Sequence, residues 1–216
     1  DDVDTAISVS VSYTDGGGAV EEVTSAPTST IANTNDLPTG GLSITGTASQ
    51  ENTLTVDATA LRDEDGLGDL SYQWLRDGSD ISGATATAYT LVEADVGKNI
   101  SVKATYTDGY GAPETVTSSE TSAVTNRNDS PTGAITISGT AAEDQTLTAA
   151  STLEDPDGMS ELSYQWKADG ADISNATNST LTLSQDEVGK EISVTASYTD
   201  GGGTVESVTS ASTTTV

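Results

Sequence analysis

The feature that most constrains the fold of this chain is an internal repeat of domain size. The tripeptide Tyr-Thr-Asp begins at Tyr13, Tyr106 and Tyr198, which lie 93 and then 92 residues apart. A second pattern, Tyr72-Gln73-Trp74, recurs as Tyr164-Gln165-Trp166 with the same spacing. Repetition at a fixed period indicates successive copies of one structural unit. The sequence therefore predicts a tandem array rather than one large domain.

The frame of the repeat is set by a Pro-containing stretch. Asn35-Asp36-Leu37-Pro38-Thr39-Gly40 recurs at 128–133 as Asn-Asp-Ser-Pro-Thr-Gly. Proline disfavours a continuing strand ladder, and Asn and Asp favour turns, so these stretches are expected to be linkers. Division there predicts repeats at 35–127 and 128–216. Residues 1–34 then form the C-terminal part of a preceding, truncated repeat, because the chain from Val3 onward matches the chain from Val96 onward.

Within a repeat, apolar and polar residues alternate over short segments separated by Gly- and Asp-rich turns. This period of two is typical of antiparallel strands with one buried face. The apolar positions of one repeat are Ile44, Leu54, Val56, Leu61, Tyr72, Trp74, Tyr89, Leu91, Ile100, Val102, Ala104, Tyr106 and Val116. Six or seven strands in about 92 residues is the size of an immunoglobulin-type domain. We therefore expect an all-β protein of tandem immunoglobulin-like antiparallel β-sandwiches, with helix only as a single turn near Glu93–Val96.

The charge balance and the absence of Cys and His exclude several classes of function. The chain carries 34 acidic and 7 basic residues, for a formal net charge of -27. Nucleic acids and anionic membrane surfaces need clustered Lys and Arg, so neither is an expected partner. The chain has no Cys and no His, which removes thiol catalysis and the usual triads. The paired carboxylates Asp63 and Asp65 recur in the next copy, which argues against a glycosidase pair. No catalytic residue is predicted, and the chain is expected not to be an enzyme.

Acidic residues recur in three loops of each repeat. In an immunoglobulin-type sandwich these loops lie at one end, so their side chains are expected to converge. Calcium takes about 6–8 oxygen ligands, and two carboxylates about 4 Å apart repel by roughly 4 kcal/mol at an effective dielectric near 20. We therefore predict Ca²⁺ sites; the alternative is that these acids are solvated turn formers. The predicted ligands are Asp36, Asp63, Asp65 and Asp108 in the first complete repeat, and Asp129, Asp155, Asp157 and Asp200 in the second.

Two segments carry a resemblance to known proteins. The stretch from Tyr72 to Gly78 looks like the Trp-bearing central strand of immunoglobulin-like domains, and Leu91–Gly97 looks like their Asp-x-Gly turn. Over the whole repeat, the chain resembles the tandem immunoglobulin- or cadherin-like extender repeats of large bacterial RTX-type adhesins. This resemblance implies a structural stalk at the bacterial cell surface, with calcium-rigidified linkers and a role in adhesion and biofilm formation. Its partners would be neighbouring repeats of the same chain, with ligand-binding domains elsewhere in the parent protein.

A binding module remains the alternative to a stalk. Tyr110 stands where the other two copies have glycine, and an exposed ring there would suit a carbohydrate- or protein-binding adhesion module. Trp74 and Trp166 are expected in the cores rather than as sugar-stacking platforms. The near-identical length of the copies favours the structural role, because a dedicated binding site usually needs a copy-specific feature.

Overall fold

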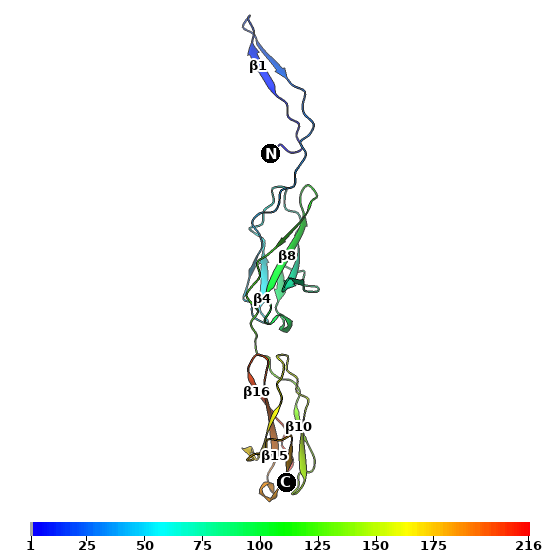
Figure 1. Cartoon of the computed structure of the whole chain (residues 1–216), viewed down its shortest axis with the longest axis vertical. Coiled ribbons are helices and arrows are strands. Elements are labelled where there is room, and N and C mark those ends of the chain that lie inside the picture. Colours follow the sequence, from blue (N-terminus) through cyan, green and yellow to red (C-terminus); the bar gives the residue numbers. More distant parts are fainter. Residues whose placement is uncertain (1) are drawn as a thin grey trace. The chain divides into compact units, whose positions relative to one another are not determined.

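The computed structural model describes residues 2–216 and is built from antiparallel strands and two short 3₁₀ turns (Figure 1). The predicted all-β, antiparallel sandwich fold is confirmed. Close contacts divide the chain into two compact units, which are described separately. Unit 1 comprises Asp1–Ala48, Asn52–Thr90 and Lys98–Ala123, and unit 2 comprises Ser49–Glu51, Leu91–Gly97 and Val124–Val216.

Unit 1 contains one sandwich of three plus four strands. The three-stranded sheet has the order β3-β4-β7, and the four-stranded sheet has the order β6-β5-β8-β9. This order, with the fifth strand crossing back to the sheet of the first two, is that of immunoglobulin-type Greek-key sandwiches. The strands are β3 (Ser43–Thr45), β4 (Thr53–Asp57), β5 (Ser71–Arg76), β6 (Ser79–Asp80), β7 (Ala88–Thr90), β8 (Ile100–Thr107) and β9 (Pro113–Thr117).

The core of this sandwich forms around Trp74. Trp74 is fully buried and pairs in register with Val102 of β8, which is also fully buried. The indole Nε1 donates a hydrogen bond to the carbonyl of Ala86 over 2.9 Å, so no polar atom of the ring is left unpartnered. The ring of Tyr89 lies 5.9 Å away, tilted by 31°. The predicted role of Trp74 as a core residue is therefore what the structure shows.

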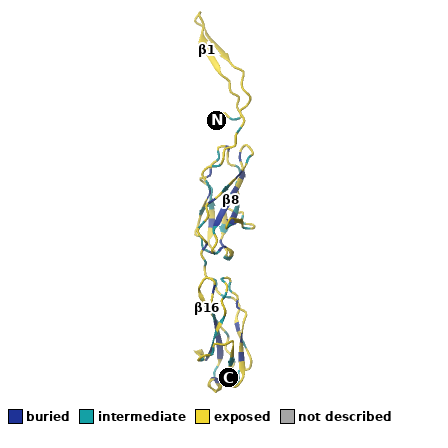
Figure 2. Cartoon of the chain, viewed as in Figure 1, coloured by how far each residue is buried: buried dark blue, intermediate teal, exposed yellow. Residues whose placement is uncertain are grey.

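A separate two-stranded hairpin precedes this sandwich in the chain. It consists of β1 (Ser10–Thr14) and β2 (Val20–Thr24), which pair with each other. Every residue of both strands is exposed, in contrast to the buried centre of the sandwich (Figure 2).

Unit 2 contains a second sandwich with the same strand order. Its sheets are β10-β11-β14 and β13-β12-β15-β16. Trp166 is fully buried, and its Nε1 donates to the carbonyl of Asn178 over 2.9 Å. The strands are β10 (Ile135–Ser138), β11 (Thr146–Ser151), β12 (Ser163–Ala168), β13 (Ala171–Asp172), β14 (Thr180–Thr182), β15 (Ile192–Thr199) and β16 (Val205–Thr209).

The two 3₁₀ turns are η1 (Glu93–Asp95) and η2 (Gln185–Glu187). Each is closed by an acidic side chain at its third position: Asp95 Oδ2 accepts a hydrogen bond from the Val92 amide over 2.8 Å, and Glu187 Oε2 accepts one from the Ser184 amide over 2.9 Å. A carboxylate that satisfies a free amide at the start of a turn stabilises that turn. The single turn predicted near Glu93–Val96 is confirmed as η1.

Unit 2 also includes the segments around Gln50 and η1. The amide of Gln50 donates to the Thr125 carbonyl over 3.0 Å, and the amide of Gly97 donates to the Val124 carbonyl over 2.9 Å. The Arg127 amide in turn donates to Gln50 Oε1 over 3.0 Å. These bonds hold η1 close to residues 124–129. The repeat boundaries proposed from the sequence, 1–34, 35–127 and 128–216, remain predictions.

Candidate metal site

The loop before β12 is folded around Asp155. Asp155 Oδ1 accepts a hydrogen bond from the Asp157 amide over 2.9 Å, and its main-chain carbonyl accepts one from Gly158 over 3.0 Å. Its other carboxylate oxygen accepts the hydroxyl of Tyr198. Both oxygens of Asp155 are therefore engaged within the protein, and its role is to shape the loop that carries Asp157.

Three segments that are distant in sequence meet at Asp157. Asp157 Oδ2 accepts a hydrogen bond from the amide of Asp129 over 2.7 Å, and its carbonyl accepts one from the amide of Gly201 over 2.8 Å. A Cβ atom at Gly201 would lie 2.4 Å from that carbonyl oxygen, so only glycine permits the approach. The linker, the loop before β12 and the loop after β15 thus converge as the sequence pattern indicates.

Glu93, Asp129 and Asp157 form a compact group of carboxylates within unit 2. One oxygen from each lies within 4.8 Å of the others. Glu93 comes from η1, Asp129 from the linker, and Asp157 from the loop before β12. Gln50 orients the group, because its Nε2 donates to Asp129 Oδ2 over 2.9 Å while its Oε1 is held by the Arg127 amide.

Several oxygens near this group are buried without a hydrogen-bond partner in the protein. They include Glu93 Oε2 and Asp157 Oδ1. Asn126 Oδ1 and Asp200 Oδ2 are orphaned in the same way, and the Asn126 side chain lies against Gly202, next to the Asp157–Gly201 contact. A buried oxygen without a partner is destabilising by about 1–3 kcal/mol. All four atoms are hydrogen-bond acceptors, which suits a cation rather than an anion.

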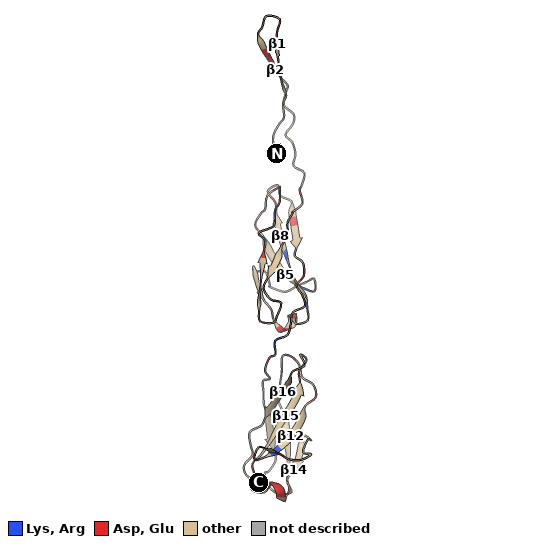
Figure 3. Ribbon diagram, turned by 90° about the vertical axis from the view of Figure 1, so that its left-hand side faces the viewer, with Lys and Arg blue, Asp and Glu red and all other residues tan. Residues whose placement is uncertain are grey.

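The electrostatics agree with that assignment. Burial is the main cause that raises the pKa of Glu93 above its ordinary value, and the charges of Asp157 and Asp129 add to it. Arg127, the basic residue nearest to Asp129 in sequence, pairs instead with Glu51. Figure 3 shows how few Lys and Arg residues the sandwiches carry among their acids.

The corresponding acids of unit 1 form similar loops but no such group. Asp36 donates its amide to Asp65 Oδ2 over 2.7 Å, and Gly109 donates its amide to the Asp65 carbonyl over 3.0 Å. Asp63 accepts the Asp65 amide and the Tyr106 hydroxyl. Asp108 Oδ1 closes its own turn, and its Oδ2 is buried without a partner. Among the described residues, these four acids do not bring three carboxylates within 4.8 Å.

The eight ligands predicted from sequence therefore have different surroundings. Asp129 and Asp157 are in the compact group, Asp155 and Asp200 adjoin it through the loop contacts described above, and the four acids of unit 1 are not members of it. Glu93 was not among the predicted ligands, because it lies in η1 and not in the loops expected at one end of each sandwich. One signal was present in the sequence. Glu93 and Gln185 lie three residues before the matching Val96 and Val188, so the acidic side chain at this position is specific to the first complete copy.

No protein-family model matches the sequence. The chain is similar to the "Highly immunogenic outer capsid protein" of Enterobacteria phage T4, with 34% identity over 120 residues. The matched region covers 54% of this chain and 32% of the phage protein, so the chain spans about a third of the length of that relative. Within residues 2–216, no helix has the length and apolar character needed to cross a membrane.

Proposed function

We propose that this chain is a stretch of spacer repeats from a protein exposed on an outer surface, and that a calcium ion held by Glu93, Asp129 and Asp157 stiffens its linker. The observation that carries the proposal is the origin of the three carboxylates. Glu93 precedes residues 124–128 in the chain, whereas Asp129 and Asp157 follow them. A cation shared by all three would fasten the segments on both sides of that linker.

Calcium fits this group better than other common ions. The ligands are carboxylate oxygens, and calcium prefers oxygen ligands in flexible arrangements completed by water. Zinc and copper sites usually include Cys or His, and the chain has neither. Magnesium demands tighter octahedral geometry and keeps more of its water. The residues present are therefore suited to a calcium site that is completed by solvent.

The spacer role follows from what the two sandwiches share. Both have the same strand order, the same buried Trp with its bond to a main-chain carbonyl, and the same Tyr-to-Asp hydrogen bond. Each copy carries its own core of the same design, so repetition of the unit adds length to the chain. The resemblance to adhesin extender repeats supports the same role.

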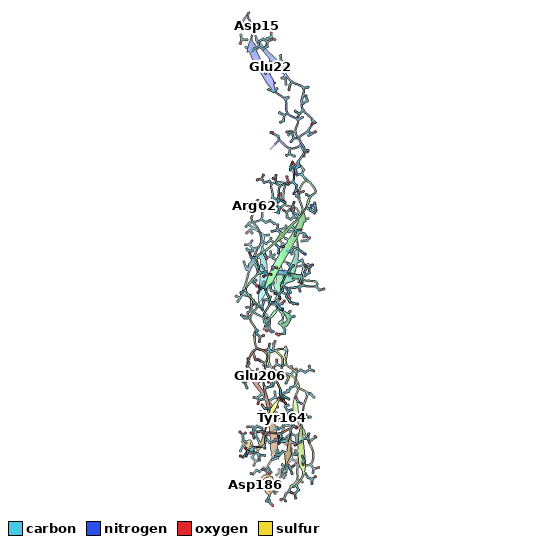
Figure 4. All side chains as sticks on the ribbon, in the orientation of Figure 1. Asp15, Glu22, Arg62, Tyr164, Asp186 and Glu206 are labelled. Atoms are coloured by element: carbon cyan, nitrogen blue, oxygen red, sulfur yellow. The ribbon has the colours of Figure 1, made fainter. Side chains whose placement is uncertain are left out.

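A calcium titration of the full chain tests the proposal. Calcium should raise the unfolding temperature of unit 2, and chelation should increase the range of linker conformations seen by small-angle scattering. Glu93→Gln should remove most of the calcium response. Asp186→Asn is the matched control, because it removes one charge from the corresponding turn η2, at the end of the second sandwich opposite Glu206 (Figure 4). An equal calcium response in both variants, or none in the parent chain, would sink the proposal.

The setting of the spacer has two candidates. The resemblance to RTX-type adhesins favours a bacterial cell surface, whereas the similarity to a phage outer capsid protein favours the outside of a virus particle. Antibodies against this chain distinguish them, since they would label either cells or purified virions of the source.

The alternative function is that of a carbohydrate- or protein-binding adhesion module, for which the exposed Tyr110 is the relevant observation. A glycan array that binds the parent chain but not Tyr110→Gly would support it.

A further inference from the structure

The β1–β2 hairpin has the register of the last two strands of a sandwich. Tyr13 pairs with Glu21 in β1–β2, Tyr106 pairs with Glu114 in β8–β9, and Tyr198 pairs with Glu206 in β15–β16. A short parallel bridge also recurs, between Val3 and Ile31 and between Val96 and Val124. The hairpin therefore has the backbone pairing of a sandwich from which the other strands are missing.

Side-chain hydrogen bonds recur at the same positions. The amide of Val9 donates to Ser25 Oγ over 3.1 Å, as Val102 does to Ser118 over 3.0 Å. The amide of Ile7 donates to a threonine hydroxyl, as Ile100 and Ile192 do in the sandwiches. These bonds give the chain around β1 the same path that the matching segments around β8 and β15 have in the complete sandwiches.

The apolar face of the hairpin is nevertheless uncovered. Val9 and Tyr13 are 63% and 55% exposed, whereas Val102 and Tyr106 at the matching positions are 0% and 5% exposed. In the sandwich, β5 pairs with the free edge of β8 and the three-stranded sheet covers its face. An isolated two-stranded hairpin is at best marginally stable in water, and an open strand edge favours pairing with another strand.

Gly16 gives independent evidence of a missing loop. At the matching positions, a Cβ on Gly109 or Gly201 would lie 2.5 Å or 2.4 Å from the carbonyl oxygen of the loop before the Trp strand. A Cβ on Gly16 would meet nothing within 4 Å. Glycine is required at this position only when such a loop packs against the hairpin, because a side chain would then collide with the carbonyl oxygen of the loop.

We propose that the β1–β2 hairpin is a docking surface for the first five strands of a repeat of the same type, supplied by polypeptide that precedes it. The Trp-bearing strand of that segment pairs antiparallel with β1 and places its Trp opposite Val9, as Trp74 lies opposite Val102. Its apolar sheet then covers Val9, Val11 and Tyr13.

A second copy of the hairpin is a poorer occupant. Residues 3–31 include Asp4, Asp15, Glu21 and Glu22 and no Lys or Arg, and Asp15 and Glu22 are labelled on the hairpin in Figure 4. Two such hairpins packed together would bring like charges close, and no Trp would fill the position opposite Val9. Charge and shape therefore both favour the Trp-bearing segment.

The test extends the full chain by a copy of residues 35–93 joined ahead of Asp1. Because the chain lacks cysteine, a single Val11→Cys reports on the buried face, and Ser12→Cys reports on the outward face of the same strand. Docking is expected to slow thiol labelling of Val11→Cys by at least about 100-fold. Labelling of Ser12→Cys should stay fast, because the matching Thr105 is exposed in the complete sandwich.

A second extended chain, in which the copied Trp is replaced by Asp, controls for simple crowding by the added segment. The proposal expects fast Val11→Cys labelling in that chain. Equal labelling of Val11→Cys with and without the extension would overturn the proposal. Protection of Val11→Cys in the unextended chain that grows with protein concentration would also overturn it, because the occupant would then be a second copy.

Discussion

The hydroxyl of Tyr106 donates a hydrogen bond to Asp63 Oδ2 over 2.6 Å, and Tyr198 makes the same bond to Asp155. In each sandwich this bond links the end of the long strand β8 or β15 to the acidic loop before the Trp strand. The other oxygen of each Asp accepts the amide two residues further on. The Tyr-Thr-Asp signature of the repeat thus holds the loop that carries the candidate metal ligands.

Removal of the Tyr106 hydroxyl tests this link. Tyr106→Phe leaves Asp63 Oδ2 without its donor, and the loss should reduce the free energy of unfolding of unit 1 by about 1–2 kcal/mol. Urea denaturation followed by tryptophan fluorescence in a Trp166→Phe background, in which Trp74 is the remaining tryptophan, measures it. Tyr13→Phe is the matched control, since Tyr13 is exposed in the hairpin and its change should leave stability unaltered. Equal effects of the two substitutions would contradict the assigned role.

The same tyrosines predict a loss of stability at alkaline pH. Burial, and then the hydrogen bond to Asp63, raise the pKa of Tyr106 above its ordinary value. A raised folded-state pKa means that the stabilisation is complete below the unfolded value of about 10 and is lost as pH rises from there toward the folded value. Denaturation curves measured above and below that pH should show the decline in the parent chain. Tyr106→Phe should show a smaller decline in unit 1.

The raised pKa of Glu93 predicts a pH dependence of stability opposite to that of an acid whose pKa is lowered by folding. Its raised pKa means that, in the presence of a chelator, unit 2 gains stability as pH falls from neutral through the folded pKa of Glu93. The gain is complete near the unfolded value, and Glu93→Gln should flatten this part of the profile. Thermal melts across the acidic range, with chelator, provide the measurement. A pH profile that is unchanged in Glu93→Gln would show that this carboxyl does not carry the effect.

Glycine substitution distinguishes the hairpin from the sandwiches. Gly201→Ala places a Cβ against the Asp157 carbonyl and should destabilise unit 2 by roughly 1–3 kcal/mol. Gly16→Ala, at the matching position of the hairpin, meets no atom within 4 Å and should have little effect. Thermal melts of both variants, with and without calcium, compare them. A large loss in Gly16→Ala would show that the hairpin is packed in a way the structure does not contain.

Much of the fold followed from local pattern. Period-two alternation predicted the strands that contain Tyr72 and Trp74 and those from Ile100 to Tyr106, because one face of each strand must be apolar to be buried. The short strand β6 was not predicted, since Ser79 and Asp80 carry no apolar alternation. Leu61 and Leu91 belong to the core but lie outside the strands, so their burial comes from loops folding over the sandwich.

The candidate site was only partly accessible from sequence. Asp129 and Asp157 were predicted because turn-forming acids recur in loops that an immunoglobulin-type sandwich gathers at one end. Glu93 was not, because its position depends on how η1 is held against residues 124–129 by the bonds of Gln50 and Gly97. Such contacts are set by three-dimensional packing and have no period in the sequence.

The sequence by itself determined that this protein is a cysteine-free, acidic array built on one repeating β-pattern, because alternation, turn residues and spacing are local properties. Tertiary structure decided which of the many acids come together and which glycines are required. It also showed that similar strand sequences at matching repeat positions are buried in β8 and exposed in β1. The physical reason is the same in each case: burial and charge repulsion depend on which neighbours are present, and neighbours distant in sequence are brought together only by the fold.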